Sequence, residues 1–517
     1  MLTELYRPIQ LEDALRGNLP QKYVRSLAAP DLYFALQEVS EDTRREVLAL
    51  ALPEQVQGIL DLDSWEESRL DLMRLRDWYH SLTKAMPPGR LAIHLREIDA
   101  ELLVALVVSE FEVFPIGPDF EAGAPGTDAD WQSPDGKFWL YRRATPLRED
   151  SELAGPMLDL MYQIDDDRAR GILMEAAVGL LSELEETAFR FREARLTDMG
   201  FPPADVAAAI WDPRRTREVL VTPDEATRGR YMAVEVAHRS SLRQHLEALP
   251  EQRQADVGAE LVVLANAAIM SEGLPVRERE SVELALGMVA GYLDLALEIE
   301  EGRKLLAQST TQAVFQLGLG RVSGLNRRAR GLLASGVFDQ WGRTLTLLSV
   351  PERAFLENLA RRHPLFADPS IPEARVRPFA RQEDLVRSEA TLARLETAAT
   401  VLFAPDGLAG QTDAWQDEAL LPPREERTID SLVGTLLARI VLQLPVSIEP
   451  VSRGDIRKLL ASIDRLADFR GAIEQVADAS QPLGAWMIER SEHWLEDLRG
   501  AGGNPALVTA VLHYPEG

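Results

Sequence analysis

The strongest candidates for metal chemistry are three consecutive acids, Asp165, Asp166 and Asp167. Clustered carboxylates suit hard cations such as Mg²⁺, which take oxygen ligands and retain water. Two further pairs of acids occupy equivalent places in the chain: Asp99 and Glu101, and Glu41 and Asp42. However, these acids also stand where a helix N-terminus favours a capping side chain and negative charge in its first turn. Because capping accounts for all of them without a metal, it is the favoured interpretation.

A second candidate set combines Glu235 with His238 and His245. Their spacing would place all three on one face of a helix. Di-iron carboxylate bundles need the Glu-x-x-His motif twice, together with two more glutamates, and the sequence contains this motif once. We therefore expect a surface or helix-packing feature.

The segment Gly318-Leu-Gly-Arg-Val-Ser-Gly324 approaches a dinucleotide-binding fingerprint, but Ser323 stands in place of the third glycine. The fingerprint is meaningful only between a strand and a helix, and residues 311–317 do not have a strand pattern. A helix break with close packing is the better prediction here.

A basic cluster overlaps the end of this segment and continues beyond it, and its members are Arg321, Arg327, Arg328 and Arg330. A solvated helix face is the plain interpretation. The alternative is a site for phosphate, an acidic peptide or self-association, so these arginines are the candidate partner-binding residues. The sequence contains no Gly-x-Ser-x-Gly, His-Glu-x-x-His or phosphate-loop motif, and it nominates no catalytic residue and no cofactor.

Composition narrows the function classes further. The 517 residues include 56 Lys and Arg against 83 Asp and Glu, a net charge of −27 that opposes general binding to nucleic acid or anionic lipid. The absence of cysteine excludes disulfides and thiolate metal sites. The longest apolar runs, Leu102–Val108 and Leu261–Met270, are far shorter than the roughly 20 residues of a membrane-spanning helix. With no signal peptide at the N-terminus, a cytoplasmic protein without membrane insertion is expected.

Helical periodicity dominates the chain. Three short helices are predicted first, with Asp31 and Ser40 as caps of the first two and Pro53 opening the third. A similar phrase, an apolar pair followed by polar residues, an aliphatic residue and a cap, then recurs. Its copies are residues 35–41, 94–101, 160–167 and, more weakly, 245–251. Each copy predicts a helix, a one-residue corner and another helix, in an irregular repeat.

Residues 116–150 interrupt this pattern, because the turn Pro134-Asp-Gly136 and the aromatic residues after it favour a β-hairpin. A short strand is also predicted at 218–222. The expected fold is mainly α, an irregular superhelical or multi-helical stack with one inserted β-hairpin. The expected units are an N-terminal short-helix unit (1–115), the hairpin loop (116–150), a second helical unit with a linker (151–230), a long-helix unit (231–362) and a C-terminal helical unit (363–517).

Two resemblances accompany these patterns. Residues 29–65 resemble the short-helix phrase in the cytosolic N-terminal domain of magnesium channels of the MgtE type, and similar units of flagellar motor switch proteins, through Leu32-Tyr-Phe-Ala-Leu36 and Leu52-Pro-Glu54. A fuller resemblance is to an uncharacterised family of bacterial soluble proteins, known only as a domain of unknown function. It is carried by residues 60–65, 200–211, 291–298 and 376–379 and implies architecture without a reaction or ligand.

Three functions follow as hypotheses. The first is a protein-binding or scaffold protein whose helical surface engages a protein partner or a second copy of itself. The second is a divalent-cation-responsive regulator, motivated by the channel-like phrase and the acid-rich corners. The third is an enzyme without a recognisable motif, which the sequence favours least. Whether a small molecule binds is left open by the sequence.

Overall fold

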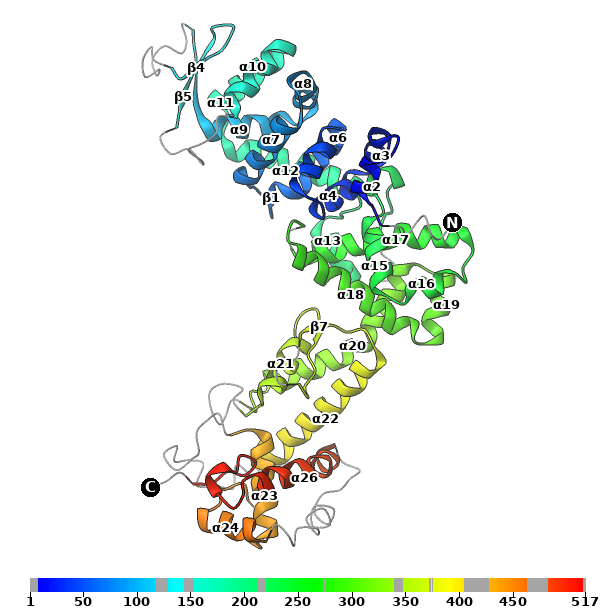
Figure 1. Ribbon diagram of the computed structural model, residues 1–517, viewed down its shortest axis with the longest axis vertical. Helices are drawn as coiled ribbons and strands as arrows, with labels where there is room; N and C mark the ends of the chain where they lie inside the picture. The colour runs from blue at the N-terminus through cyan, green and yellow to red at the C-terminus, as the bar shows by residue number, and fades with distance from the viewer. Residues whose placement is uncertain are drawn as a thin grey trace. The chain divides into compact units, whose positions relative to one another are not determined.

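The computed structural model describes residues 8–117, 129–143, 153–212, 220–273, 276–338, 347–371, 373, 375–403, 427–445, 447–462 and 482–514. Within these ranges helices dominate, and strands form only three small antiparallel sheets (Figure 1). The predicted mainly-α fold is therefore confirmed. The chain divides into two compact units, Met1–Leu317 and Gly318–Gly517.

The helices of the first unit are short near its N-terminus and longer toward its end. They are α2 (Leu11–Leu15), α3 (Pro20–Ser26), α4 (Ala29–Gln37), α5 (Glu41–Leu48), α6 (Pro53–Asp63), α7 (Leu72–Ala85), α8 (Pro88–Glu97), α9 (Ala100–Glu110), α10 (Ala154–Ile164), α11 (Asp166–Val178), α12 (Leu181–Asp198), α13 (Ala204–Ala207), the 3₁₀ turn η1 (Ala208–Trp211), α14 (Glu225–Arg228), α15 (Tyr231–Arg239), α16 (Leu242–Leu246), α17 (Glu251–Ser271), α18 (Arg279–Leu297) and α19 (Glu300–Gln308). Helix α20 (Thr311–Ala334) contains the boundary between the units.

Local capping residues set the first short helices. The Ser40 hydroxyl accepts a hydrogen bond from the backbone N–H of Thr43 and caps α5, and Pro53 is the first residue of α6, both as predicted. The expected role of Asp31 is wrong, because α4 already begins at Ala29. Asp31 is buried in the first turn of α4, and its carboxylate instead accepts hydrogen bonds from the N-terminus of α15.

The recurring phrase marks helix–corner–helix junctions, as predicted. The first copy joins α4 to α5, the second α8 to α9, the third α10 to α11 and the fourth α16 to α17. Only the third has a corner of one residue, Asp165. In the other copies the connection is longer, so the phrase fixes the presence of a corner but not its length.

The predicted β-hairpin is present as β4 (Trp131–Gln132) and β5 (Phe138–Arg142), joined by a turn in which Gly136 has a positive φ of 69°. A third strand, β3 (Phe111–Pro115), follows α9 directly and pairs with β5, so that the strand order is β3-β5-β4. A second small sheet pairs β1 (Trp65–Glu66) with β2 (Arg69–Leu70). Of the strand expected at 218–222, residues 220–222 are not in a strand and residues 218 and 219 lie outside the described residues.

The second unit contains the remainder of α20 and the elements that follow it. These are α21 (Val350–Leu359), β6 (Leu365–Phe366), β7 (Arg377–Pro378), α22 (Gln382–Phe403), α23 (Ile429–Val441), α24 (Arg453–Ala461), α26 (Pro482–Gly500) and the 3₁₀ turn η7 (Pro505–Leu507). Strands β6 and β7 form the third sheet.

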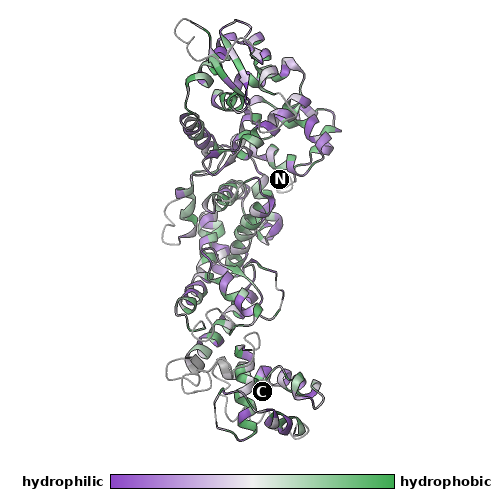
Figure 2. Ribbon diagram, turned by 90° about the vertical axis from the view of Figure 1, so that its left-hand side faces the viewer, coloured by the Kyte–Doolittle hydropathy of each residue, from purple (hydrophilic) through white to green (hydrophobic). Residues whose placement is uncertain are grey.

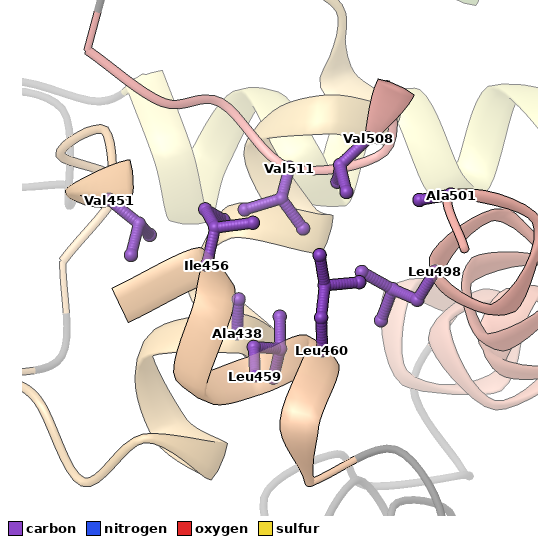
Figure 3. Close-up of a cluster of buried hydrophobic side chains, with 9 residues drawn as sticks. All are labelled: Ala438, Val451, Ile456, Leu459, Leu460, Leu498, Ala501, Val508 and Val511. Atoms are coloured by element: carbon purple, nitrogen blue, oxygen red, sulfur yellow. The ribbon is translucent and has the colours of Figure 1, made fainter. Parts of the chain in front are cut away.

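A compact apolar cluster holds the C-terminal helices of this unit together (Figure 3). Its side chains come from α23, α24 and α26, from the residues just before α24 and just after α26, and from the segment after η7. Its buried members are Ala438, Val451, Ile456, Leu459, Leu460, Leu498, Ala501, Val508 and Val511. The chain also crosses α23 closely at Gly434, where an added Cβ would lie 2.0 Å from the Ala510 carbonyl oxygen. Only glycine permits this approach.

Most helices are amphipathic, so hydrophilic and hydrophobic residues alternate along them (Figure 2). This alternation is the pattern expected of helices with one face packed and the other solvated. None of the described helices combines the length and the apolar character that crossing a bilayer requires.

Candidate functional site

The acidic triplet lies at the start of α11. The Asp165 carboxylate caps this helix by accepting a hydrogen bond of 3.0 Å from the backbone N–H of Arg168. Asp166 and Asp167 follow in the first turn, where the guanidinium of Arg170 pairs with them at 2.9 and 2.7 Å. The same guanidinium contacts Asp135 in the β4–β5 turn at 3.0 Å. Capping and ion pairing therefore engage all three acids of the triplet.

The acids at equivalent corners have similar structural roles. Glu41 and Asp42 are in the first turn of α5 and pair with arginines of the same helix. Asp99 is in the N-cap position of α9, but its carboxylate contacts Arg195 at 2.7 Å rather than capping the helix. Arg195 also contacts the buried Asp61 at 2.6 Å, which ties α6 and α9 to α12.

Burial alone would lower the pKa of Arg195. Hydrogen bonding to Asp61 and the negative charge of its carboxylate outweigh this effect, so the pKa of Arg195 is raised. The guanidinium of Arg195 therefore stays charged in this cluster. Within the described ranges, no three acids or histidines converge in a geometry suited to a metal ion.

The second candidate set is divided between two helices: Glu235 and His238 lie on α15, and His245 lies on α16. Helix α15 ends at Arg239 and α16 begins at Leu242, so the predicted common face is wrong. The physical reason is a capping contact from another helix: the Asp294 carboxylate accepts hydrogen bonds from the backbone N–H and the hydroxyl of Ser241, each at 2.7 Å. This contact fixes the start of α16 and turns the chain between the two histidines.

The glycine-rich segment 318–324 lies inside α20, which is continuous from Thr311 to Ala334. The predicted helix break is therefore wrong. A glycine inside a helix costs about 1 kcal/mol relative to alanine. Regularly spaced side chains, among them Phe315, Val322 and Ala329, are buried along one face of α20, and their burial offsets that cost.

The candidate arginines all lie on α20, and two of them line a groove between α20 and α22. Arg321 donates a hydrogen bond to Gln382. Seven residues later Arg328 contacts Glu389 at 2.5 Å. Because both contacts join residues 61 positions apart, the two helices run in the same direction here, as Figure 1 also shows.

The groove has a volume of about 560 Å³. Its floor is apolar, formed by the buried side chains of Leu325 and Leu385. Its remaining lining is Arg321, Gly324 and Arg328 from α20, and Gln382, Val386, Glu389 and Ala390 from α22. Val386 leaves 56% of its surface exposed, so the groove presents apolar surface to solvent between two polar contacts.

Charge is unevenly distributed around this groove. Helix α20 contains four arginines and no acid, in a chain with a net charge of −27. Arg328 is held by Glu396 at 2.8 Å as well as by Glu389, and these hydrogen bonds raise its pKa. Arg327 and Arg330 are exposed on α20. The structure thus places Arg321 and Arg328 at the groove, with Arg327 and Arg330 on the exposed surface of the same helix.

The α22 half of the groove was not among the sequence candidates. Its lining residues 382, 385, 386, 389 and 390 have the spacing of one helical face, and this spacing was the available signal. Nothing local indicates which helix lies beside α20.

Comparisons with known proteins add one relationship. A family model matches residues 10–509, nearly the whole chain, and its description is a family of unknown function (DUF6178). Searches of curated proteins and of solved structures returned no match.

Proposed function

This chain belongs to that family of unknown function, and we propose that it is a cytoplasmic protein-binding or scaffold protein whose docking surface is the groove between α20 and α22. One observation carries the proposal. The groove combines an apolar floor, Leu325 and Leu385, with arginines at its edge.

This combination is typical of protein-binding surfaces. Their energetic centres are apolar pockets, and arginine is enriched among the residues that contribute most to binding. The Arg328 side chain is already ordered by Glu389 and Glu396, so a partner would lose less side-chain entropy by contacting it.

Affinity purification of the full-length chain from its native host tests the proposal. An added Cβ at Gly324 would contact nothing within 4 Å, so Gly324→Leu adds an isobutyl group at the groove from a position where its Cβ is accommodated. Gly171 in α11 is the matched control, since a Cβ there also contacts nothing within 4 Å.

At low salt, the wild type and Gly171→Leu are expected to recover the same partner in a fixed stoichiometry, and Gly324→Leu to lose it. Recovery of that partner by Gly324→Leu at the wild-type level would overturn the assignment of the groove. If neither the wild type nor either variant recovers a stoichiometric partner, the protein-binding function itself is overturned.

A further inference from the structure

We infer that a basic patch on the second unit binds a short acidic segment of another protein. The patch consists of four arginines, Arg327 and Arg330 of α20 and Arg361 and Arg362, which follow α21. The inference does not rest on the groove between α20 and α22, because it concerns another face of α20. It adds a second contact surface and states the chemistry of the partner.

The Asn326 side chain brings the two parts of the basic patch together. Its amide group donates hydrogen bonds to the carbonyl oxygens of Leu359 and Arg361 at 2.7 and 2.8 Å, which hold the end of α21 against α20 (Figure 1). Arg327 follows Asn326 directly, and Arg330 comes four residues after Asn326, one turn along the same side of α20. The backbone of Arg361 therefore lies beside the two arginines of α20.

All four side chains of the basic patch are exposed. Among the described residues none of them pairs with an acid, whereas Arg328 of the same helix pairs with Glu389 and Glu396. Glu357 is exposed on α21 one turn before Arg361, and these two side chains do not pair either. The basic patch thus carries four positive charges with which no carboxylate in the described part of the chain forms an ion pair.

Charge complementarity sets the class of partner. Like charges that lie close together repel one another, and carboxylates of a partner would both relieve this repulsion and form charge-assisted hydrogen bonds with the guanidinium groups. Because the four side chains stand on open surface, they suit several carboxylates spaced along a segment better than they suit one small anion.

Two other classes of anion fit the basic patch less well. A long nucleic acid would extend beyond the patch over a chain with a net charge of −27, whereas a short acidic segment stays within the patch. Phosphate groups are typically bound at helix N-termini, where backbone N–H groups point outward. The helix end beside this patch is the C-terminus of α21.

Two peptides test the inference on the full-length chain. The probe is a fluorescein-labelled peptide of about ten residues in which glutamate alternates with serine, so that its carboxylates are spread along the segment. In the control peptide glutamine replaces every glutamate. Fluorescence anisotropy at about 0.1 M salt measures binding, because charges more than roughly 10 Å away are screened under these conditions and the local patch dominates.

The glutamate peptide is expected to bind saturably, and the glutamine peptide to bind at least roughly tenfold more weakly. Arg330→Gln with Arg361→Gln removes one charge from each part of the basic patch and should weaken binding of the glutamate peptide by roughly tenfold. Arg190→Gln with Arg243→Gln is the matched control, because both arginines are exposed in the first unit and pair with no acid among the described residues. This control variant should bind like the wild type, and circular dichroism confirms that both variants are folded.

Equal binding of the two peptides, or an equal loss of binding in the patch variant and the control variant, would overturn the inference. A phosphoserine peptide or a single-stranded oligonucleotide that binds the patch more tightly than the glutamate peptide would overturn it as well. So would sedimentation that shows a dimer lost in the patch variant, since the occupant would then be a second copy of the chain. Gly324→Leu should leave peptide binding unchanged, so failure of the basic patch and failure of the docking groove are distinguishable.

Discussion

The carboxylate of Asp31 accepts a hydrogen bond of 2.7 Å from the backbone N–H of Tyr231, the first residue of α15, across 200 positions of the chain. It accepts a second bond of 2.7 Å from the N–H of Arg230. Unpaired N–H groups and the helix dipole make a helix N-terminus a favourable place for a carboxylate. Asp31 thus joins α4 to α15 by capping a helix that is remote in sequence.

The same arrangement recurs at other helix starts. Glu110 accepts from the N–H of Ala154 at α10, Asp294 from Ser241 at α16, and Glu260 from Thr311 at α20. Each acid comes from a different helix or strand end of the first unit. Part of the acidity of this chain therefore fixes the positions of helices rather than coating the exterior.

Asp31→Ala is expected to destabilise the chain by about 2 kcal/mol, because it leaves two partly buried N–H groups without this acceptor. Asp31→Asn should cost less, since its amide oxygen can still accept a hydrogen bond. Urea denaturation of the wild type and of both variants measures their free energies of unfolding, and the asparagine variant should lie between the other two. Equal stability of the alanine variant and the wild type would show that remote capping contributes nothing.

Substitution by alanine is expected to change the stability of the chain in opposite directions at two helix glycines. Gly324→Ala adds a methyl group into open space and should stabilise the fold by about 1 kcal/mol through helix propensity. Gly434→Ala places that methyl group 2.0 Å from the Ala510 carbonyl oxygen, so a loss of about 2 kcal/mol or more is expected. Thermal melting of the two single variants provides the comparison, and a loss of stability in Gly324→Ala would contradict the open position of that glycine.

Magnesium is expected to have little specific effect on stability. Arg170 already pairs with Asp166 and Asp167, and Asp165 is engaged in capping. Melting with millimolar MgCl₂ should match melting at equal ionic strength set with NaCl. A larger increase with MgCl₂ that disappears in Asp166→Asn with Asp167→Asn would instead support the cation-responsive regulator.

A pH dependence is expected from His363, which is 6% exposed and whose pKa burial lowers to about 4. Between pH 6.5 and 4 the unfolded chain binds a proton at this histidine and the folded chain does not. The free energy of unfolding therefore decreases by roughly 3 kcal/mol as the pH falls through this window. His363→Phe should show a smaller loss over the same range, and identical pH profiles for the two forms would contradict this role.

Local rules explain what the sequence could predict. Ser40, Pro53 and Asp165 act on backbone groups within a few residues, so their helix starts follow from residue type and spacing alone. The β4–β5 hairpin was predictable for the same reason, because its turn lies within the hairpin.

Non-local contacts explain what the sequence could not predict. The break between His238 and His245 depends on Asp294, 53 positions from Ser241. The continuity of α20 through Gly320 and Gly324 depends on burial of its opposite face. The candidate arginines were identified on one helix, but the groove beside them needs α22, which lies 61 positions further along the chain.

Photocrosslinking in the native host tests the docking groove most directly. A photoreactive phenylalanine derivative placed at Ala390, which lines the groove, is compared with the same residue placed at Gly171, which is exposed on α11. Position 390 should yield one adduct of defined mass, absent at position 171 and abolished by Gly324→Leu. No adduct from position 390, or the same adducts from both positions, would contradict a docking surface between α20 and α22.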